Sequence, residues 1–165
     1  MRLTKISTKT GDDGYTLHNG VRIPKVSPAI IAMGKVDSLN VQVGLLRLSI
    51  NEYLLESIQH VLFDIGADLY GIEKFDKDDL KTLEERILQL NANLGPLKEF
   101  VIPFGSPTTM QAHVCRTICR EAEIAVLQMD SRQIVRQYMN RLSDYFFLLA
   151  RGSDEELWNN KNGSN

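Results

Sequence analysis

Apolar residues recur every three to four positions along five separate stretches of this 165-residue chain. That spacing matches the 3.6-residue turn of an α-helix, so each stretch predicts an amphipathic helix with one face turned to a core. Short connectors between helices favour antiparallel neighbours, so we expect an all-α protein with a five-helix up-and-down bundle. The predicted helices cover residues 27–50, 52–70, 76–94, 106–129 and 131–151.

Local signals mark several helix ends. Ser27-Pro28 and Ser106-Pro107 each place a capping serine before a proline at the first helical position. Gly95-Pro96 stops the third helix. No other segment shows a convincing strand pattern, and the apolar residues 100–105 are expected to form a rigid connector. Trp158 is the one residue of the polar C-terminal tail expected to dock it on the rest of the protein.

Length and charge narrow the class of protein. The chain is long enough for one domain, which we divide into an arm (1–26), a bundle (27–151) and a polar tail (152–165). A net charge of −2 predicts binding neither to nucleic acid nor to a membrane. No apolar run is long enough to span a bilayer, and residues 1–9 lack a signal peptide's apolar core. Cys115 and Cys119 are expected to be reduced thiols of a cytoplasmic protein.

Arg116, Arg120 and Glu123 are spaced four and then three residues apart in the fourth predicted helix. On a helix this spacing places all three side chains on one stripe. Two guanidinium groups and a carboxylate in line can hold a polyanion beside a hydroxyl-rich group. The alternative is an exposed face of ordinary ion pairs, each worth ~0.3–0.5 kcal/mol. Spacing alone leaves both interpretations open.

The arm contains a glycine-bounded polar segment at residues 8–14, with the sequence Thr-Lys-Thr-Gly-Asp-Asp-Gly. It lacks the spacing of a Walker A loop, but it has hydroxyls, a lysine and glycines whose backbone N–H groups can approach a phosphate. The alternative is a plain turn. A ferritin-type di-iron site is not expected, because no histidine follows a glutamate by three residues, and we predict no metal ligands in the protein.

Four segments, taken in order, resemble the PduO-type ATP:cob(I)alamin adenosyltransferases. They are residues 8–14; Arg22-Ile23-Pro24-Lys25 with Val36-Asp37-Ser38-Leu39-Asn40; Phe100-Val101-Ile102-Pro103; and residues 116–123 with Asn140-Arg141-Leu142-Ser143-Asp144. The resemblance spans nearly the whole chain. It implies a cobalamin adenosyltransferase-like, ferritin-like bundle with an extended N-terminal phosphate-binding arm.

The resemblance also implies an activity. Members transfer the 5′-deoxyadenosyl group of ATP to the cobalt of cob(I)alamin, a cob(I)yrinic acid a,c-diamide adenosyltransferase reaction that releases tripolyphosphate and uses Mg²⁺. It implies a homotrimer with ATP sites between subunits, and it admits a flavoprotein reductase as partner. An alternative is a catalytically weak relative that binds ATP or corrinoid as a carrier or sensor. A bundle with a merely solvated stripe is a third interpretation.

Residue roles follow from the same resemblance. Glu123 and Asn140 are expected on the nucleoside side, Arg116 and Asp37 are expected to form an inter-helix ion pair, and Phe100 is expected to close the lower face of the corrin. From the residues alone, the alternative for Phe100 is a core phenylalanine that caps the helix bundle. The phosphate-binding set is expected to be Thr8, Lys9, Thr10, Gly11, Thr16, Lys25 and Arg120. Departures from the family pattern occur at Met33, Ser38, Phe104 and Leu17-His18-Asn19-Gly20, where members usually have a Gly-rich stretch.

Overall fold

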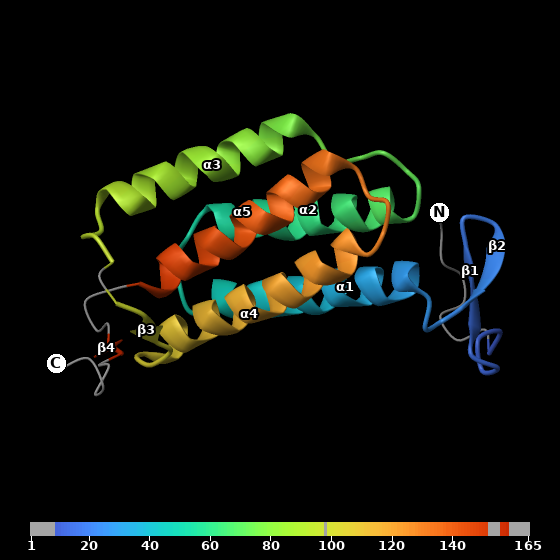
Figure 1. Cartoon of the computed structure of the whole chain (residues 1–165), viewed down its shortest axis with the longest axis horizontal. Helices are drawn as coiled ribbons and strands as arrows, with labels where there is room; N and C mark the ends of the chain where they lie inside the picture. The colour runs from blue at the N-terminus through green and yellow to red at the C-terminus, as the bar shows by residue number, and fades with distance from the viewer. Residues whose placement is uncertain (1–8, 98, 152–155, 159–165) are drawn as a thin grey trace, which may run out of the picture.

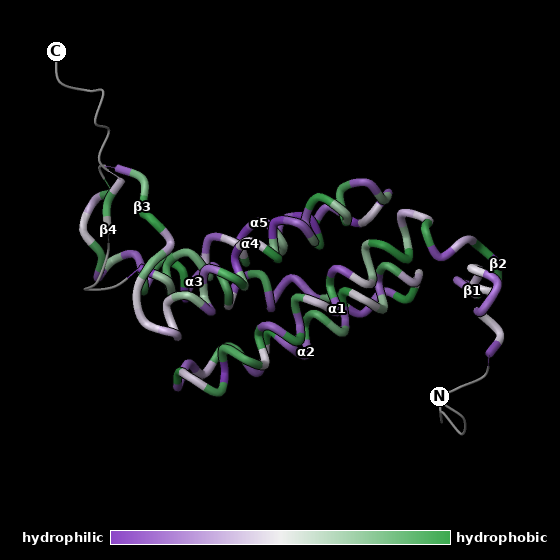
Figure 2. Tube along the Cα trace, turned by 90° about the horizontal axis from the view of Figure 1, so that it is seen from below, coloured by the Kyte–Doolittle hydropathy of each residue, from purple (hydrophilic) through white to green (hydrophobic). Residues whose placement is uncertain are grey.

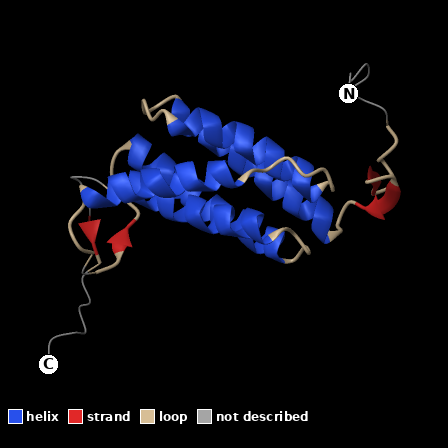
Figure 3. Cartoon of the chain, turned by 90° about the horizontal axis from the view of Figure 1, so that it is seen from above, coloured by secondary structure: helices blue, strands red, loops and turns tan. Residues whose placement is uncertain are grey.

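The computed structural model describes residues 9–97, 99–151 and 156–158. Strand pairs lie at opposite ends of one helical bundle (Figures 1 and 3). Within the described residues the helices are α1 (Pro28–Arg47), α2 (Leu54–Leu69), α3 (Lys77–Ala92), α4 (Pro107–Leu127) and α5 (Gln133–Ala150). The strands are β1 (Tyr15–His18), β2 (Val21–Pro24), β3 (Val101–Ile102) and β4 (Glu156–Leu157).

The predicted five-helix bundle is confirmed, and each helix lies one to three residues inside its predicted bounds. The cap at the start of α4 forms as expected, because the Ser106 hydroxyl accepts a 3.1 Å hydrogen bond from the Thr109 backbone N–H. At the start of α1, Pro28 follows Ser27, but the Ser27 side chain makes no capping hydrogen bond. The proline there marks the helix start without help from the serine hydroxyl.

The core lies between α1, α2, α4 and α5, and α3 packs on α5 (Figure 1). The largest fully buried side chains include Tyr138, Tyr145 and Phe146, all from α5. Among the residues of α3 only Leu83 is buried, so this helix covers α5 with one narrow apolar edge. Figure 2 shows hydrophobic and polar residues interleaved along each helix, as an amphipathic bundle requires.

By length and composition alone, α1 could cross a membrane, with a mean hydropathy of 1.2. It is not an uninterrupted apolar run, because Gly34, Asn40 and Gly44 lie within it. Residues on its inner side, including Val36, Leu39 and Val43, are buried, and the helix packs on α2 and α4. In this fold α1 is therefore a core helix of the bundle.

The sequence shows no convincing strand pattern, yet short strands form at both ends of the bundle. Tyr15–His18 pairs with Val21–Pro24 as an antiparallel hairpin, and Val101–Ile102 pairs with Glu156–Leu157. Strands of two to four residues are too short to show a period of two. The second pair also joins segments more than 50 residues apart, which no local pattern signals.

Candidate functional site

One side of α4 carries Arg116, Arg120 and Glu123 next to α5, and we call these three residues the arginine stripe. Glu123 Oε1 accepts a 3.0 Å hydrogen bond from Asn140 Nδ2 of α5, so the two residues expected on the nucleoside side lie together. Arg141 donates to Asn140 Oδ1 at 2.5 Å. Both ends of the Asn140 amide are therefore used, which fixes its orientation toward Glu123.

Arg116 and Arg120 form no ion pair or hydrogen bond with any described residue. Arg116 is half-buried and its Nε atom is buried without a partner. Burial and the neighbouring Arg120 both lower the pKa of Arg116. Elsewhere in the described chain, ion pairs are formed by Arg22, Arg47, Arg86, Arg132, Arg136 and Arg141. The stripe is thus a concentrated positive charge with unused donors.

The expected ion pair between Arg116 and Asp37 is not formed within the chain. Asp37 is an exposed residue of α1 and lines a groove of about 1100 Å³ between α1 and α2, together with Asn40, Phe63 and Tyr70. The arginine stripe lies on the side of α4 that meets α5, so α1 and α4 present the two side chains in different directions. Neither the carboxylate nor the guanidinium has a partner among the described residues.

His113 extends the arginine stripe by one step, three residues before Arg116, and sequence reasoning missed it. It is 4% exposed, and neither ring nitrogen has a hydrogen-bond partner. Burial and the charge of Arg116 lower its pKa. The spacing 113–116–120–123 could have revealed it, but a single histidine on a helix is more often a core residue than a site residue.

The polar segment of the arm forms a loop closed by Lys25. The Lys25 Nζ atom donates a 2.7 Å hydrogen bond to the Gly11 carbonyl, and the Lys25 backbone N–H donates to the Gly14 carbonyl at 2.8 Å. A Cβ atom at Gly11 would lie 2.7 Å from Lys25 Nζ, so a larger residue would disturb this contact. Two residues of the expected phosphate-binding set therefore touch each other.

The other arm residues lie along the same loop and hairpin. Lys9 and Thr10 precede Gly11, and Lys9 adopts a positive φ of 56°. Thr16 lies on β1 opposite Ile23. Thr8 lies outside the described residues. The structure thus collects Lys9, Thr10, Gly11, Thr16 and Lys25 in one hairpin.

Asp13 and Arg22 brace the base of this hairpin. Their side chains form an ion pair, and the Asp13 carboxylate also accepts from the Tyr15 backbone N–H at 3.2 Å. The Tyr15 hydrogen bond is the largest cause of a lowered Asp13 pKa, with a further contribution from Arg22. The loop is therefore held in place by its own side chains.

Phe100 is 77% exposed, so the alternative in which it is a core residue is wrong. Its ring meets Trp158 edge to face at 6.3 Å, and its carbonyl accepts from the Trp158 backbone N–H at 2.7 Å. The expectation that Trp158 docks the tail is confirmed. With Val101, Ile102 and Pro103, the two aromatic rings line an apolar hollow of about 390 Å³, and we call these five residues the Phe100 surface.

The arm and the Phe100 surface lie at opposite ends of the bundle (Figure 1). The 21-residue helix α4 runs from the β3 end toward the arm end, a length of about 30 Å at 1.5 Å per residue. Of the described arm residues, none is hydrogen-bonded or ion-paired to the arginine stripe. A single chain therefore does not gather all the expected site residues in one place.

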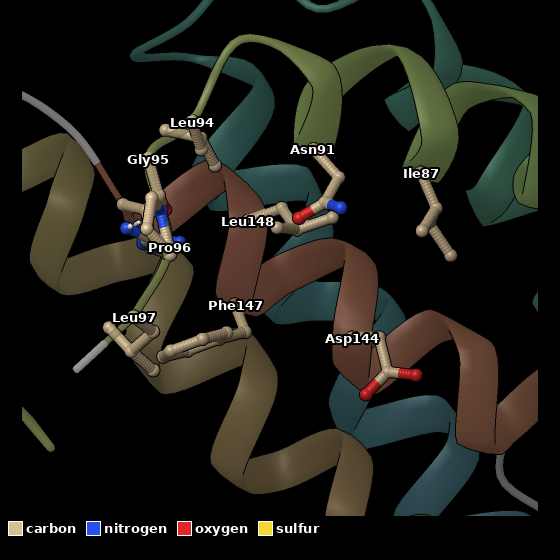
Figure 4. Close-up of a pocket in the computed structure, with 10 residues that line it drawn as sticks. Ile87, Asn91, Leu94, Gly95, Pro96, Leu97, Asp144, Phe147 and Leu148 are labelled. Carbon is tan, nitrogen blue, oxygen red and sulfur yellow. Dashed lines mark hydrogen bonds between the residues drawn. The ribbon is translucent and has the colours of Figure 1, made fainter. Parts of the chain in front are cut away.

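A second cavity, of about 420 Å³, lies between the end of α3, the connector that follows it and α5 (Figure 4). Figure 4 shows Phe147 of α5 extending toward Leu97 of the connector. Asp144, which also lines it, is paired with Arg141 at 3.3 Å. Sequence reasoning missed this cavity because two segments far apart in sequence, 87–97 and 144–151, form its wall.

The comparisons with known proteins are consistent over nearly the full chain. A family model of cobalamin adenosyltransferases matches residues 6–153. A cobalamin adenosyltransferase of Cupriavidus metallidurans is 41% identical, over 95% of this chain and 95% of the relative. A corrinoid adenosyltransferase of Bacillus subtilis is 40% identical, over 89% of this chain and 85% of the relative. A variant of the PduO-type ATP:corrinoid adenosyltransferase of Lactobacillus reuteri, solved with cobalamin and ATP, superposes with a TM-score of 0.86 at 35% identity, covering 94% of this chain and 100% of that one.

Proposed function

The chain belongs to the cobalamin adenosyltransferase family, and on that basis we propose that it transfers the 5′-deoxyadenosyl group of ATP to the cobalt of cob(I)alamin. One observation carries the assignment of the site. Two guanidinium groups lie one helical turn apart without a carboxylate partner among the described residues, beside the hydrogen-bonded Glu123 and Asn140. Two like charges at this spacing cost ~0.2–0.5 kcal/mol in an isolated helix. A bound polyphosphate reverses that cost.

In the proposed reaction the Co(I) electron pair attacks the 5′ carbon of ATP. A cobalt–carbon bond forms, the C5′–O bond breaks, and the electron pair of that bond leaves with tripolyphosphate. Co(I) is a strong nucleophile, so the protein's task is to align it with the 5′ carbon and to stabilise the leaving group. Arg120 reaches the phosphates with a planar fork of donors, as phosphate recognition requires. The Glu123 carboxylate accepts from the nucleoside hydroxyls.

The hairpin arm supplies the second half of the phosphate site. Lys9, Thr10, Gly11, Thr16 and Lys25 bring hydroxyl, ammonium and backbone N–H donors, and Thr8 is included in the same set. The donor contacts fit a polyanion. When ATP binds, the Lys25 ammonium exchanges the Gly11 carbonyl for a phosphate oxygen.

Mg²⁺ fits this site as an ion that arrives on the triphosphate. The described residues contain no group of three or more histidine, cysteine, aspartate or glutamate side chains able to hold a metal. Mg²⁺ commonly binds through substrate phosphates, with several waters and one or two carboxylates. Its contribution is to neutralise charge on the leaving polyphosphate.

We propose a homotrimer with each ATP site between two subunits. The support is the separation of the arm from the Phe100 surface along a bundle about 30 Å long. A site that uses both must draw them from different copies in a head-to-tail ring. In the same arrangement Asp37, which is exposed and unpaired among the described residues, forms its ion pair with the arginine stripe of a second copy.

The Phe100 surface is the proposed seat of the lower corrin face. Its exposed rings and the apolar hollow beside them exclude water and any axial donor from the cobalt. Without an axial ligand, Co(II) is reduced to Co(I) more easily, and a flavoprotein reductase is the proposed electron source.

We place the protein in the cytoplasm as one adenosyltransferase domain. Cys115 and Cys119 are buried free thiols, and burial raises the pKa of Cys115 to about 12.

The test is direct turnover. Chemically reduced cob(I)alamin and Mg-ATP are incubated with the protein, and adenosylcobalamin is measured by absorbance and tripolyphosphate by anion-exchange chromatography. We expect both products in equal amounts. ATP binding by calorimetry without either product would support the carrier or sensor alternative. No binding at all would support a solvated stripe.

A further inference from the structure

The tip of the β1–β2 hairpin rests on the C-terminal end of α2 in the same chain. The His18 ring meets the Tyr70 ring edge to face, with 5.1 Å between centroids and 74° between planes. Next to it, a Cβ atom at Gly71 would lie 3.2 Å from the Asn19 side-chain nitrogen, so the Asn19 side chain lies close against the Gly71 backbone.

The tip and the base of the hairpin are rigidly connected through its paired strands. Asn19 and Gly20 have positive φ values of 47° and 77°, the pattern of the tight two-residue turn that matches strand twist. Four residue pairs join the strands above that turn. At the base, the Lys25 backbone N–H donates a 2.8 Å hydrogen bond to the Gly14 carbonyl, a contact that does not use the ammonium group. The glycine loop and the hairpin tip are thus joined by one short, hydrogen-bonded pair of strands, so a shift of one moves the other.

Tyr70 is an anchor on a rigid element. Its backbone N–H donates to the Gly66 and Ala67 carbonyls, both at 3.1 Å, which caps α2. The preceding residue, Leu69, is buried in the core. Tyr70 also lines the groove between α1 and α2. The contact with Tyr70 therefore fixes the hairpin tip relative to the helical bundle.

We propose that His18 is a positioning residue, which through its contact with Tyr70 holds the arm where the glycine loop meets the nucleotide phosphates. The identity of the nucleotide in this inference rests on the proposed function, whereas the contact between His18 and Tyr70 does not depend on it. A free arm must be ordered each time ATP binds, and that ordering cost raises the apparent dissociation constant. An arm held at its tip has already lost much of that freedom.

The experiment compares three variants of the full chain. His18→Ala removes the ring, His18→Phe keeps an aromatic ring against Tyr70, and Leu17→Ala is the matched control. Leu17 is the preceding strand residue, 67% exposed, and points to the other face of the hairpin. The readouts are KM for ATP, kcat, thermal midpoint, and the rate of tryptic cleavage after Arg22 without ATP.

We expect His18→Ala to raise KM for ATP about three- to tenfold with little change in kcat, the range to which one aromatic pair converts. Cleavage after Arg22 should quicken by a similar factor, since it needs the hairpin to open, while the thermal midpoint stays within error. His18→Phe should restore both values, and Leu17→Ala should change neither. If His18→Ala leaves cleavage at the wild-type rate, or if Leu17→Ala quickens it equally, the proposal is wrong.

The cleavage measurement separates this inference from the proposed function. If the wild-type chain shows no adenosyl transfer, the function fails, and the cleavage rates alone decide whether His18 anchors the arm. If transfer occurs and all variants share one KM and one cleavage rate, the function stands and the anchor fails.

Discussion

Replacing Arg120 by alanine should lower activity and leave the fold intact or slightly more stable. Arg120 is exposed and makes no ion pair or hydrogen bond with a described residue, so its removal breaks no contact that holds the bundle. It also removes a like charge one turn from Arg116, whose pKa is lowered by burial and by that charge. The expected gain in stability is ~0.2–0.5 kcal/mol. Loss of one preorganised donor to the leaving group should lower kcat by about 10²–10³.

The assay measures adenosylcobalamin formation from pre-reduced cob(I)alamin at saturating Mg-ATP, beside a urea unfolding curve. Arg120→Lys keeps the charge but loses the fork and should recover part of the rate. The matched control is Arg47→Ala, on α1. The Arg47 side chain lies away from the stripe and pairs with Glu56 at 3.0 Å. A loss of stability by Arg120→Ala, with kcat per folded molecule unchanged, would refute the reasoning.

Three further predictions follow from single residues. Burial lowers the pKa of His113, so below pH ~6.5 the unfolded chain binds more protons than the folded one. The free energy of unfolding should therefore fall as the pH is lowered from about 7.5 to 5.5. His113→Gln should flatten that pH dependence, measured by thermal unfolding. Phe100→Ala should slow reduction of Co(II) more than reaction of pre-reduced Co(I), without changing the thermal midpoint, because the side chain is 77% exposed; equal losses in the two assays would contradict its role. Gly11→Ala should raise KM for ATP about three- to tenfold, because the added Cβ would lie 3.2 Å from the Tyr15 backbone carbonyl and would shift the loop that presents its N–H groups to the phosphates; an unchanged KM would contradict the loop's place in the phosphate site.

The helices could be predicted from sequence because each is a long run with apolar residues every three to four positions. Pro28 and Pro107 mark two starts, and the apolar spacing fixes which face is buried. The short strands could not be predicted, because the pair Val101–Ile102 and Glu156–Leu157 depends on a tertiary contact. The exposure of Phe100 follows from that same pair, so its sequence interpretation as a core residue failed for the same reason.

The candidate site was predictable where one helix carries it. The spacing of Arg116, Arg120 and Glu123 is a property of α4 alone, and Glu123 meets Asn140 as the family resemblance implies. The pairing of Arg116 with Asp37 depends on how separate helices are rotated, and the single chain does not form it. The His18–Tyr70 contact was out of reach, since sequence gives no measure of where a hairpin tip rests.

The central claim is that one copy supplies the arginine stripe and another the arm, and subunit mixing tests it most directly. Arg120→Ala, with a disabled stripe, is mixed after reversible unfolding with the double variant Lys9→Ala/Lys25→Ala, which has a disabled arm. Each alone should be nearly inactive. In a head-to-tail ring formed at random from equal amounts, about one quarter of the sites combine an intact stripe with an intact arm. We therefore predict recovery of about a quarter of wild-type activity; mixed assemblies that stay as inactive as the parents would contradict the account.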